Sequence, residues 1–137
     1  MKKMERSEVA KHFMAGTKNC AQCTLAAFAD DMGYDVEETD KLLTNFGGGV
    51  QFGEVCGAVV GANIAIGMLV DGPEAHAKGE EFCEKFIERF GSLRCKELTG
   101  YDVSIAEEFE KWKESGVGVD KCPDFVIGAY EILEEIL

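Results

Sequence analysis

Residues 47–70 read GGGVQFGEVCGAVVGANIAIGMLV, and this stretch decides the fold. After the glycine-dense opening, residues 54–70 are apolar on nearly every side of a helix, which predicts a central, buried helix. Small residues such as Gly57 and Gly61 would let neighbouring helices approach it closely. A single thiol, Cys56, lies where the glycine-rich loop meets this helix.

On both sides of this stretch, apolar residues recur at helical spacing and alternating strand patterns are missing. Asn19 with Gln22, and Ser104 with Glu107, have the spacing of capping boxes at helix starts. Residues 116–118, which contain two glycines, are predicted to form a loop. We therefore expect an all-α fold, a single compact bundle of about six or seven helices in one domain over residues 1–137.

The chain is acidic, with a formal net charge of −12. Such a chain repels polyanions, so nucleic acid is excluded as a partner, and a basic protein partner is favoured. The apolar run is shorter and more interrupted than the ~20 residues of a membrane span, and the N-terminus lacks a signal-type apolar segment. We therefore expect no membrane insertion and a cytoplasmic location; a homodimer stays open.

The chain has six cysteines, and four of them fall at predicted helix N-termini: Cys20, Cys56, Cys95 and Cys122. Free amide groups and the helix dipole favour a thiolate there, which is both the nucleophile and the metal ligand. The pKa of Cys56 in particular is expected to be lowered. Cys83 is predicted to be a core thiol. Cys23, which completes a CxxC motif with Cys20, is predicted to pack, with a redox partnership to Cys20 as the alternative.

These cysteines and the segments around them resemble the C_GCAxxG_C_C family over nearly the whole chain. The resemblance rests on the stretches NCAQ at 19–22, CGAVVG at 56–61, a cysteine before LTG at 98–100, and a cysteine near the last helix. Members are small proteins regarded as redox-active and defined by four cysteines, which the resemblance assigns to Cys20, Cys56, Cys95 and Cys122. A similar cysteine arrangement is found in the non-haem part of some split-Soret type cytochromes, where an iron–sulfur site is suspected.

Two functions from different classes follow for the four cysteines. The first is redox chemistry, thiol–disulfide exchange or electron transfer by a thiol oxidoreductase with a redox partner protein, with Cys56 as the central thiol. The second is a [2Fe–2S] cluster or a zinc ion held by Cys20, Cys56, Cys95 and Cys122, although their spacings of 35, 38 and 26 residues are unlike those of zinc knuckles or ordinary ferredoxins. A structural module whose cysteines only pack ranks third. Sulfurs gathered in one pocket would support the first two.

Four glycines are candidates for the surroundings of a cofactor: Gly48, Gly49, Gly57 and Gly61. The first two permit an unusual backbone path with exposed amides, and the other two leave space beside Cys56. The loop lacks the Lys-Ser/Thr ending of a P-loop, which disfavours a nucleotide. Asn63, in the middle of the buried helix, needs a hydrogen-bond partner. His12 and His76 are predicted at the surface, so Cys–His hydrolysis is disfavoured.

Overall fold

The computed structural model describes residues 5–137, apart from the side chains of residues 29–31. Its elements are, in chain order, α1 (Arg6–Met14), α2 (Cys20–Met32), α3 (Val36–Leu42), the turn η1 (Gly49–Gly53), α4 (Gly57–Leu69), α5 (Gly72–Phe90), α6 (Cys95–Thr99), α7 (Ala106–Ser115), α8 (Val117–Asp120) and α9 (Cys122–Ile136). The all-α prediction is confirmed. The count of about six or seven helices is wrong, because residues 5–137 contain nine.

The count differs because helices of one turn carry too few residues to show a periodic pattern. Residues 116–118 were predicted as a loop, yet α8 begins at Val117, directly after Gly116 in the left-handed conformation (φ 74°). The capping box of Ser104 and Glu107 is also wrong. Helix α7 starts after Ile105, and Ser104 instead donates its N–H and hydroxyl to the Asp102 carboxylate.

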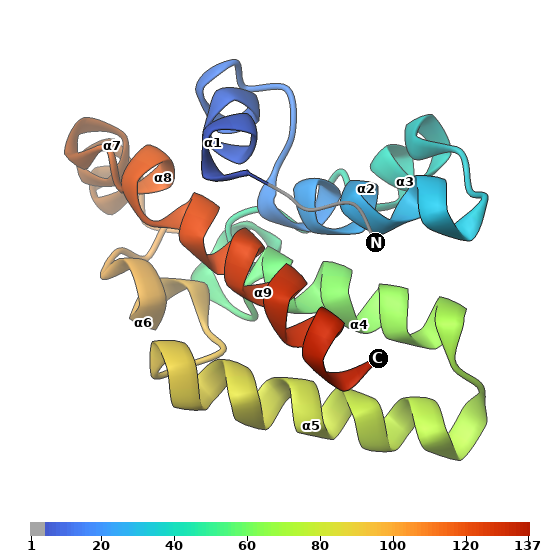
Figure 1. The fold of residues 1–137 in the computed structure, drawn as a ribbon. Helices are drawn as coiled ribbons and strands as arrows, with labels where there is room; N and C mark the ends of the chain where they lie inside the picture. The colour runs from blue at the N-terminus through green and yellow to red at the C-terminus, as the bar shows by residue number, and fades with distance from the viewer. Residues whose placement is uncertain (1–4) are drawn as a thin grey trace.

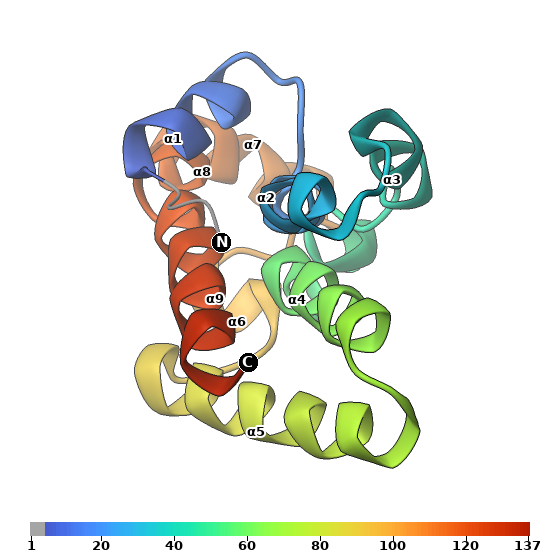
Figure 2. The same cartoon turned by 45° about the vertical axis from the view of Figure 1, so that its right-hand side comes forward.

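Two helices share the centre of the molecule. Helix α9 crosses the middle, with α1 above it and α5 below it, and it packs against α1, α2, α4, α5 and α8 (Figures 1 and 2). Helix α4 is buried as predicted along most of its length, against α2, α5 and α9. It begins at Gly57, later than the predicted 54, because the preceding residues form a turn and an extended segment. None of the helices in the described part of the chain is long and apolar enough to cross a bilayer.

Two glycines set the distance between α4 and α2. A Cβ atom added at Gly57 would lie 2.8 Å from the Ala21 N atom, and one added at Gly61 would lie 2.7 Å from the Ala21 O atom. Real Cβ atoms essentially never come this close to backbone. The two helices therefore touch backbone to backbone at this point, which holds the start of α2 against the start of α4.

The segment before α4 contains a left-handed turn at residues 48–51. The φ angles of these four residues are 61°, 62°, 59° and 63°. Glycine adopts such angles freely, but at Val50 and Gln51 the left-handed conformation costs about 1–2 kcal/mol each. The turn is secured by backbone hydrogen bonds from Gly53 N–H to Gly48 O (3.0 Å) and from Glu54 N–H to Gly49 O (3.0 Å). The glycine-rich loop thus has the unusual backbone path that was predicted.

Candidate functional site

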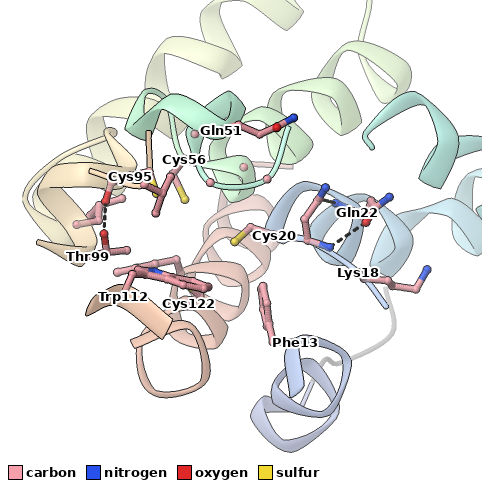
Figure 3. Close-up of a pocket in the computed structure, with 18 of the residues that line it drawn as sticks. Phe13, Lys18, Cys20, Gln22, Gln51, Cys56, Cys95, Thr99, Trp112 and Cys122 are labelled. Carbon is pink, nitrogen blue, oxygen red and sulfur yellow. Dashed lines mark hydrogen bonds between the residues drawn. The ribbon is translucent and has the colours of Figure 1, made fainter. Parts of the chain in front are cut away.

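Four cysteines lie at the starts of four different helices. Cys20, Cys95 and Cys122 are the first residues of α2, α6 and α9, and Cys56 is the N-cap of α4. All four line a single cavity of about 790 Å³. Figure 3 shows Cys56 and Cys95 together on one wall, with the sulfur of Cys20 pointing into the cavity from the α2 side. The placement at helix starts was predictable from the sequence, and the fold brings these four thiols together.

The start of α2 is fixed by the predicted capping box. The Asn19 side chain accepts from Gln22 N–H at 2.9 Å, and the Gln22 side chain accepts from Asn19 N–H at 2.8 Å. Asn19 also donates to the carbonyl oxygen of Leu43 at 2.9 Å, which ties this helix start to the end of α3. Cys20 follows Asn19 directly, so its position is fixed by the capping box and by the bond from Asn19 to Leu43.

Cys56 and Cys95 are held by a short antiparallel bridge that pairs Val55 with Arg94. The Cys56 N–H donates to Leu93 O at 2.7 Å, and the Cys95 N–H donates to Glu54 O at 2.6 Å. On the outer side, Arg94 donates to both carboxylate oxygens of Glu54 at 3.1 and 2.9 Å. In this register Cys56 is diagonal to Cys95, because residue 93 stands opposite residue 56. Such diagonal neighbours lie ~7–8 Å apart.

Cys20 and Cys122 are the two cavity thiols that influence each other most strongly. Hydrogen bonding with Cys20 lowers the pKa of Cys122, against the opposing effect of burial. The same bond, together with burial and the other three sulfurs, raises the pKa of Cys20 well above its usual value. The first proton lost from this pair therefore leaves a thiolate on Cys122 that accepts a hydrogen bond from the Cys20 thiol.

The lowered pKa expected at Cys56 is wrong. Burial raises the pKa of Cys56 to about 12, although hydrogen bonds from the Ala58 and Val59 amides act in the opposite direction. Burial likewise raises the pKa of Cys95 to about 11. The amides at the helix start do reach the sulfur, as expected, but desolvation of a charged thiolate in this apolar site outweighs them. Among the six cysteines, Cys122 is the one whose pKa is lowered.

Three of the four candidate glycines line the cavity: Gly48, Gly49 and Gly57. A Cβ atom on Gly49 would lie 2.4 Å from Glu54 N and 2.9 Å from the Cys95 Cβ atom, so only glycine fits beside that thiol. Gly61 does not line the cavity and instead makes room for α2. A role for these glycines in holding a cofactor stays a prediction.

The opposite side of the cavity is aromatic, and sequence reasoning missed this. Phe13, Phe109, Trp112 and Phe125 come from α1, α7 and α9. The rings of Phe109 and Trp112 are stacked, with centroids 5.9 Å apart and an interplanar angle of 11°. Their helical spacing looks the same as that of core residues, so no local signal could have found them. Lys18 is also part of the lining, but its side chain points away from the cysteines and is paired with the Asp40 carboxylate (Figure 3).

The other singled-out residues lie outside the cavity lining. Cys23 is buried, and burial raises its pKa to about 12. Cys83 lies on α5, where Asn63 Nδ2 approaches its sulfur at 3.9 Å. Asn63 also has the predicted backbone partner, because Nδ2 donates to Val59 O at 2.9 Å. His12 and His76 are exposed, as predicted.

A metal site requires donor atoms placed close enough to share one ion. Four thiols are a suitable donor set for zinc or for an iron–sulfur cluster. Among the side chains that the structure describes, however, no three His, Cys, Asp or Glu are placed to share one metal ion. The described arrangement of Cys20, Cys56, Cys95 and Cys122 therefore does not fit a tetrahedral metal site.

Comparison with known proteins gives one match. No curated protein and no solved structure matches the chain. A family model described as "Putative redox-active protein (C_GCAxxG_C_C)" matches residues 18–136. This match begins just before Cys20 and ends in α9, so it contains all four helix starts that meet at the cavity. The chain therefore belongs to the C_GCAxxG_C_C family.

Proposed function

We propose that this protein performs reversible dithiol–disulfide chemistry, with Cys20 and Cys122 as the reacting pair. The observation that carries the proposal is that both thiols, each at the start of a helix, line one cavity. They are also close enough that each is the main influence on the pKa of the other. A lowered pKa at one member supplies the thiolate that disulfide formation requires. The two helix starts come from opposite ends of the sequence, so their contact depends on the native fold.

The reaction moves two electrons. One sulfur–sulfur bond forms between Cys122 and Cys20 as two electrons leave for an acceptor, and the Cys20 thiol releases its proton. The thiolate form of Cys122 has already given its proton to solvent. In the reverse direction, a small dithiol that enters the cavity donates two electrons, and the same two sulfurs take up two protons.

Cys56 and Cys95 are assigned a role beside the reacting pair, outside the disulfide itself. They are diagonal neighbours across the bridge and not directly opposite each other, which favours Cys20 and Cys122 as the pair that forms the disulfide. Their raised pKa values keep both as neutral thiols at pH 7. They line the cavity beside the reacting pair and limit the negative charge that collects there.

Disulfide mapping tests the proposal. The reduced protein is treated with diamide, alkylated and digested with trypsin. The expected product links the peptide that begins at Asn19 to the C-terminal peptide that begins at Cys122. Because the first peptide also contains Cys23, the experiment is repeated with Cys23→Ser, and Cys83→Ser serves as a matched control outside the cavity. Six free thiols after diamide, or a main link between Cys56 and Cys95, would refute the pairing.

Metal analysis covers the alternative function. The observation in its favour is that four thiols line one cavity. We expect anaerobically purified protein to contain neither iron nor zinc in stoichiometric amounts, because no close group of three donors exists in the described residues. Stoichiometric metal that protects Cys20 and Cys122 from alkylation would replace the dithiol proposal by a metal-binding function.

A further inference from the structure

We propose that the cavity binds a neutral, planar quinone, and that this quinone is the two-electron acceptor for Cys20 and Cys122. The inference rests on the proposed dithiol function and adds the chemical class of the substrate. It is carried by the depth of the thiols, by the shape of the cavity walls and by their charge.

The depth of the sulfurs favours a small molecule over a protein disulfide. Cys20, Cys56, Cys95 and Cys122 are between 4% and 9% exposed. Exchange with a protein partner needs in-line attack at a sulfur that the partner can reach, and these sulfurs lie below the surface. The cavity volume of about 790 Å³ is in the range of small-molecule sites. Two thiols that only react with each other need no such space.

The walls of the cavity suit a flat ring. The backbone of four glycines contributes to the lining: Gly47, Gly48, Gly49 and Gly57. Aromatic rings form another part of the lining, and Figure 3 shows Trp112 and Phe13 on the side of the cavity where Cys122 lies, across from Cys56 and Cys95. Trp112 is held in place, because a Cβ atom on Gly118 would lie 2.7 Å from its Cζ2 atom. A planar ligand placed against these rings gains stacking and apolar burial.

The charge of the site favours a neutral ligand. Lys18 is the only basic side chain on the cavity lining in the described part of the chain, and the Asp40 carboxylate neutralises it. The chain as a whole carries a net charge of −12, which disfavours phosphate-bearing acceptors such as flavin nucleotides. Among two-electron acceptors, a quinone is both planar and uncharged.

The step balances without a further reactant. The Cys122 thiolate and the Cys20 thiol lose two electrons as the sulfur–sulfur bond forms. The quinone gains these two electrons and takes up two protons, one from the Cys20 thiol and one from solvent. The products are one disulfide and one hydroquinone.

Binding can be measured separately from the reaction, because Trp112 is the single tryptophan of the chain and lines the cavity. Duroquinone, whose ring carbons are all substituted, is titrated into the Cys122→Ser variant while tryptophan fluorescence is recorded. We expect saturable quenching with one site per chain. Phe13→Ala should weaken it at least tenfold, and the exposed Tyr34→Ala, outside the cavity lining, should leave it unchanged. Should Phe13→Ala disturb α1, Phe109→Ala on the partly exposed α7 tests the same wall.

The redox arm uses the reduced wild-type chain under anaerobic conditions. We expect one hydroquinone per chain, together with the Cys20–Cys122 disulfide. A quinone with a decyl tail that reacts equally well points to a membrane quinone, and exclusion of the tailed compound points to a soluble one.

Linear quenching like that of free N-acetyltryptophanamide would overturn the quinone proposal. So would hydroquinone formation that neither wall variant slows. If diamide forms the disulfide and duroquinone does not, the quinone inference fails and the dithiol function stands. If neither oxidant forms it, both fail.

Discussion

Replacing Gly61 by alanine should destabilise the protein, whereas the same change at Gly67 should stabilise it. Both glycines lie in α4, where alanine is ordinarily better than glycine by about 1 kcal/mol. At Gly67 an added Cβ meets nothing within 4 Å, so this gain is kept. At Gly61 the added Cβ would lie 2.7 Å from the Ala21 O atom and 3.0 Å from the Thr24 Cβ atom.

These neighbours cannot move aside separately, because they belong to the backbone and the first side-chain atom of α2. Overpacking of this kind costs about 1–3 kcal/mol. The difference between the two alanine variants removes the common helix-propensity gain and leaves the clash alone, so Gly61→Ala should be about 1–3 kcal/mol less stable than Gly67→Ala. For a chain of 137 residues, each kcal/mol shifts the Tm by about 3–4 °C.

The measurement is urea unfolding followed by circular dichroism, in excess reductant so that disulfides play no part. Thermal unfolding of both variants provides the second readout. Equal stability of the two variants would refute the backbone-to-backbone packing of α2 on α4. A companion variant, Gly57→Ala, places its Cβ 3.0 Å from the Cys20 Cβ atom and should also slow formation of the Cys20–Cys122 disulfide.

Three further predictions concern the site and the turn beside it. Burial raises the folded-state pKa of Cys56 to about 12 from 9.0, so its stabilising contribution is complete below pH 9 and is lost as the pH rises toward 12. The unfolding free energy of the reduced protein should therefore fall by about 1.4 kcal/mol per pH unit for this group, and less in Cys56→Ala; equal slopes would contradict it. Asn19→Ala should lower the free energy of unfolding in urea by about 0.5–2 kcal/mol and speed alkylation of Cys20, because it removes the side-chain cap of α2. Unchanged stability would contradict a stabilising role for this cap. Val50→Gly, at a position 43% exposed with φ 59°, should gain about 0.5–1 kcal/mol of stability, and a loss would show that the left-handed turn is not strained there.

The sequence predicts the helix starts well because capping is local. The Asn19–Gln22 pair and the end of the glycine-rich loop each mark a helix start within a few residues. Local capping signals mispredict two places. The Ser104 hydroxyl donates to Asp102 instead of capping a helix, and residues predicted as a loop form the single-turn helix α8.

The direction of the Cys56 pKa could not be predicted, because desolvation depends on helices distant in the sequence. The same holds for the contact between Cys20 and Cys122, which needs α2 and α9 to meet. The aromatic lining of the cavity could not be predicted either, because its residues have the helical spacing of ordinary core residues. The left-handed conformation of Val50 and Gln51 has no local signal either, since valine and glutamine rarely adopt it.

The bridge between residues 54–56 and 93–95 has a consequence for the motions of the chain. It joins the two ends of the α4–α5 hairpin, so the N–H groups of Cys56 and Cys95 belong to one closed loop. Separating the bridge exposes both amides in the same opening event. In native-state hydrogen exchange these two amides should therefore exchange with the same protection and the same dependence on denaturant, as one cooperative unit.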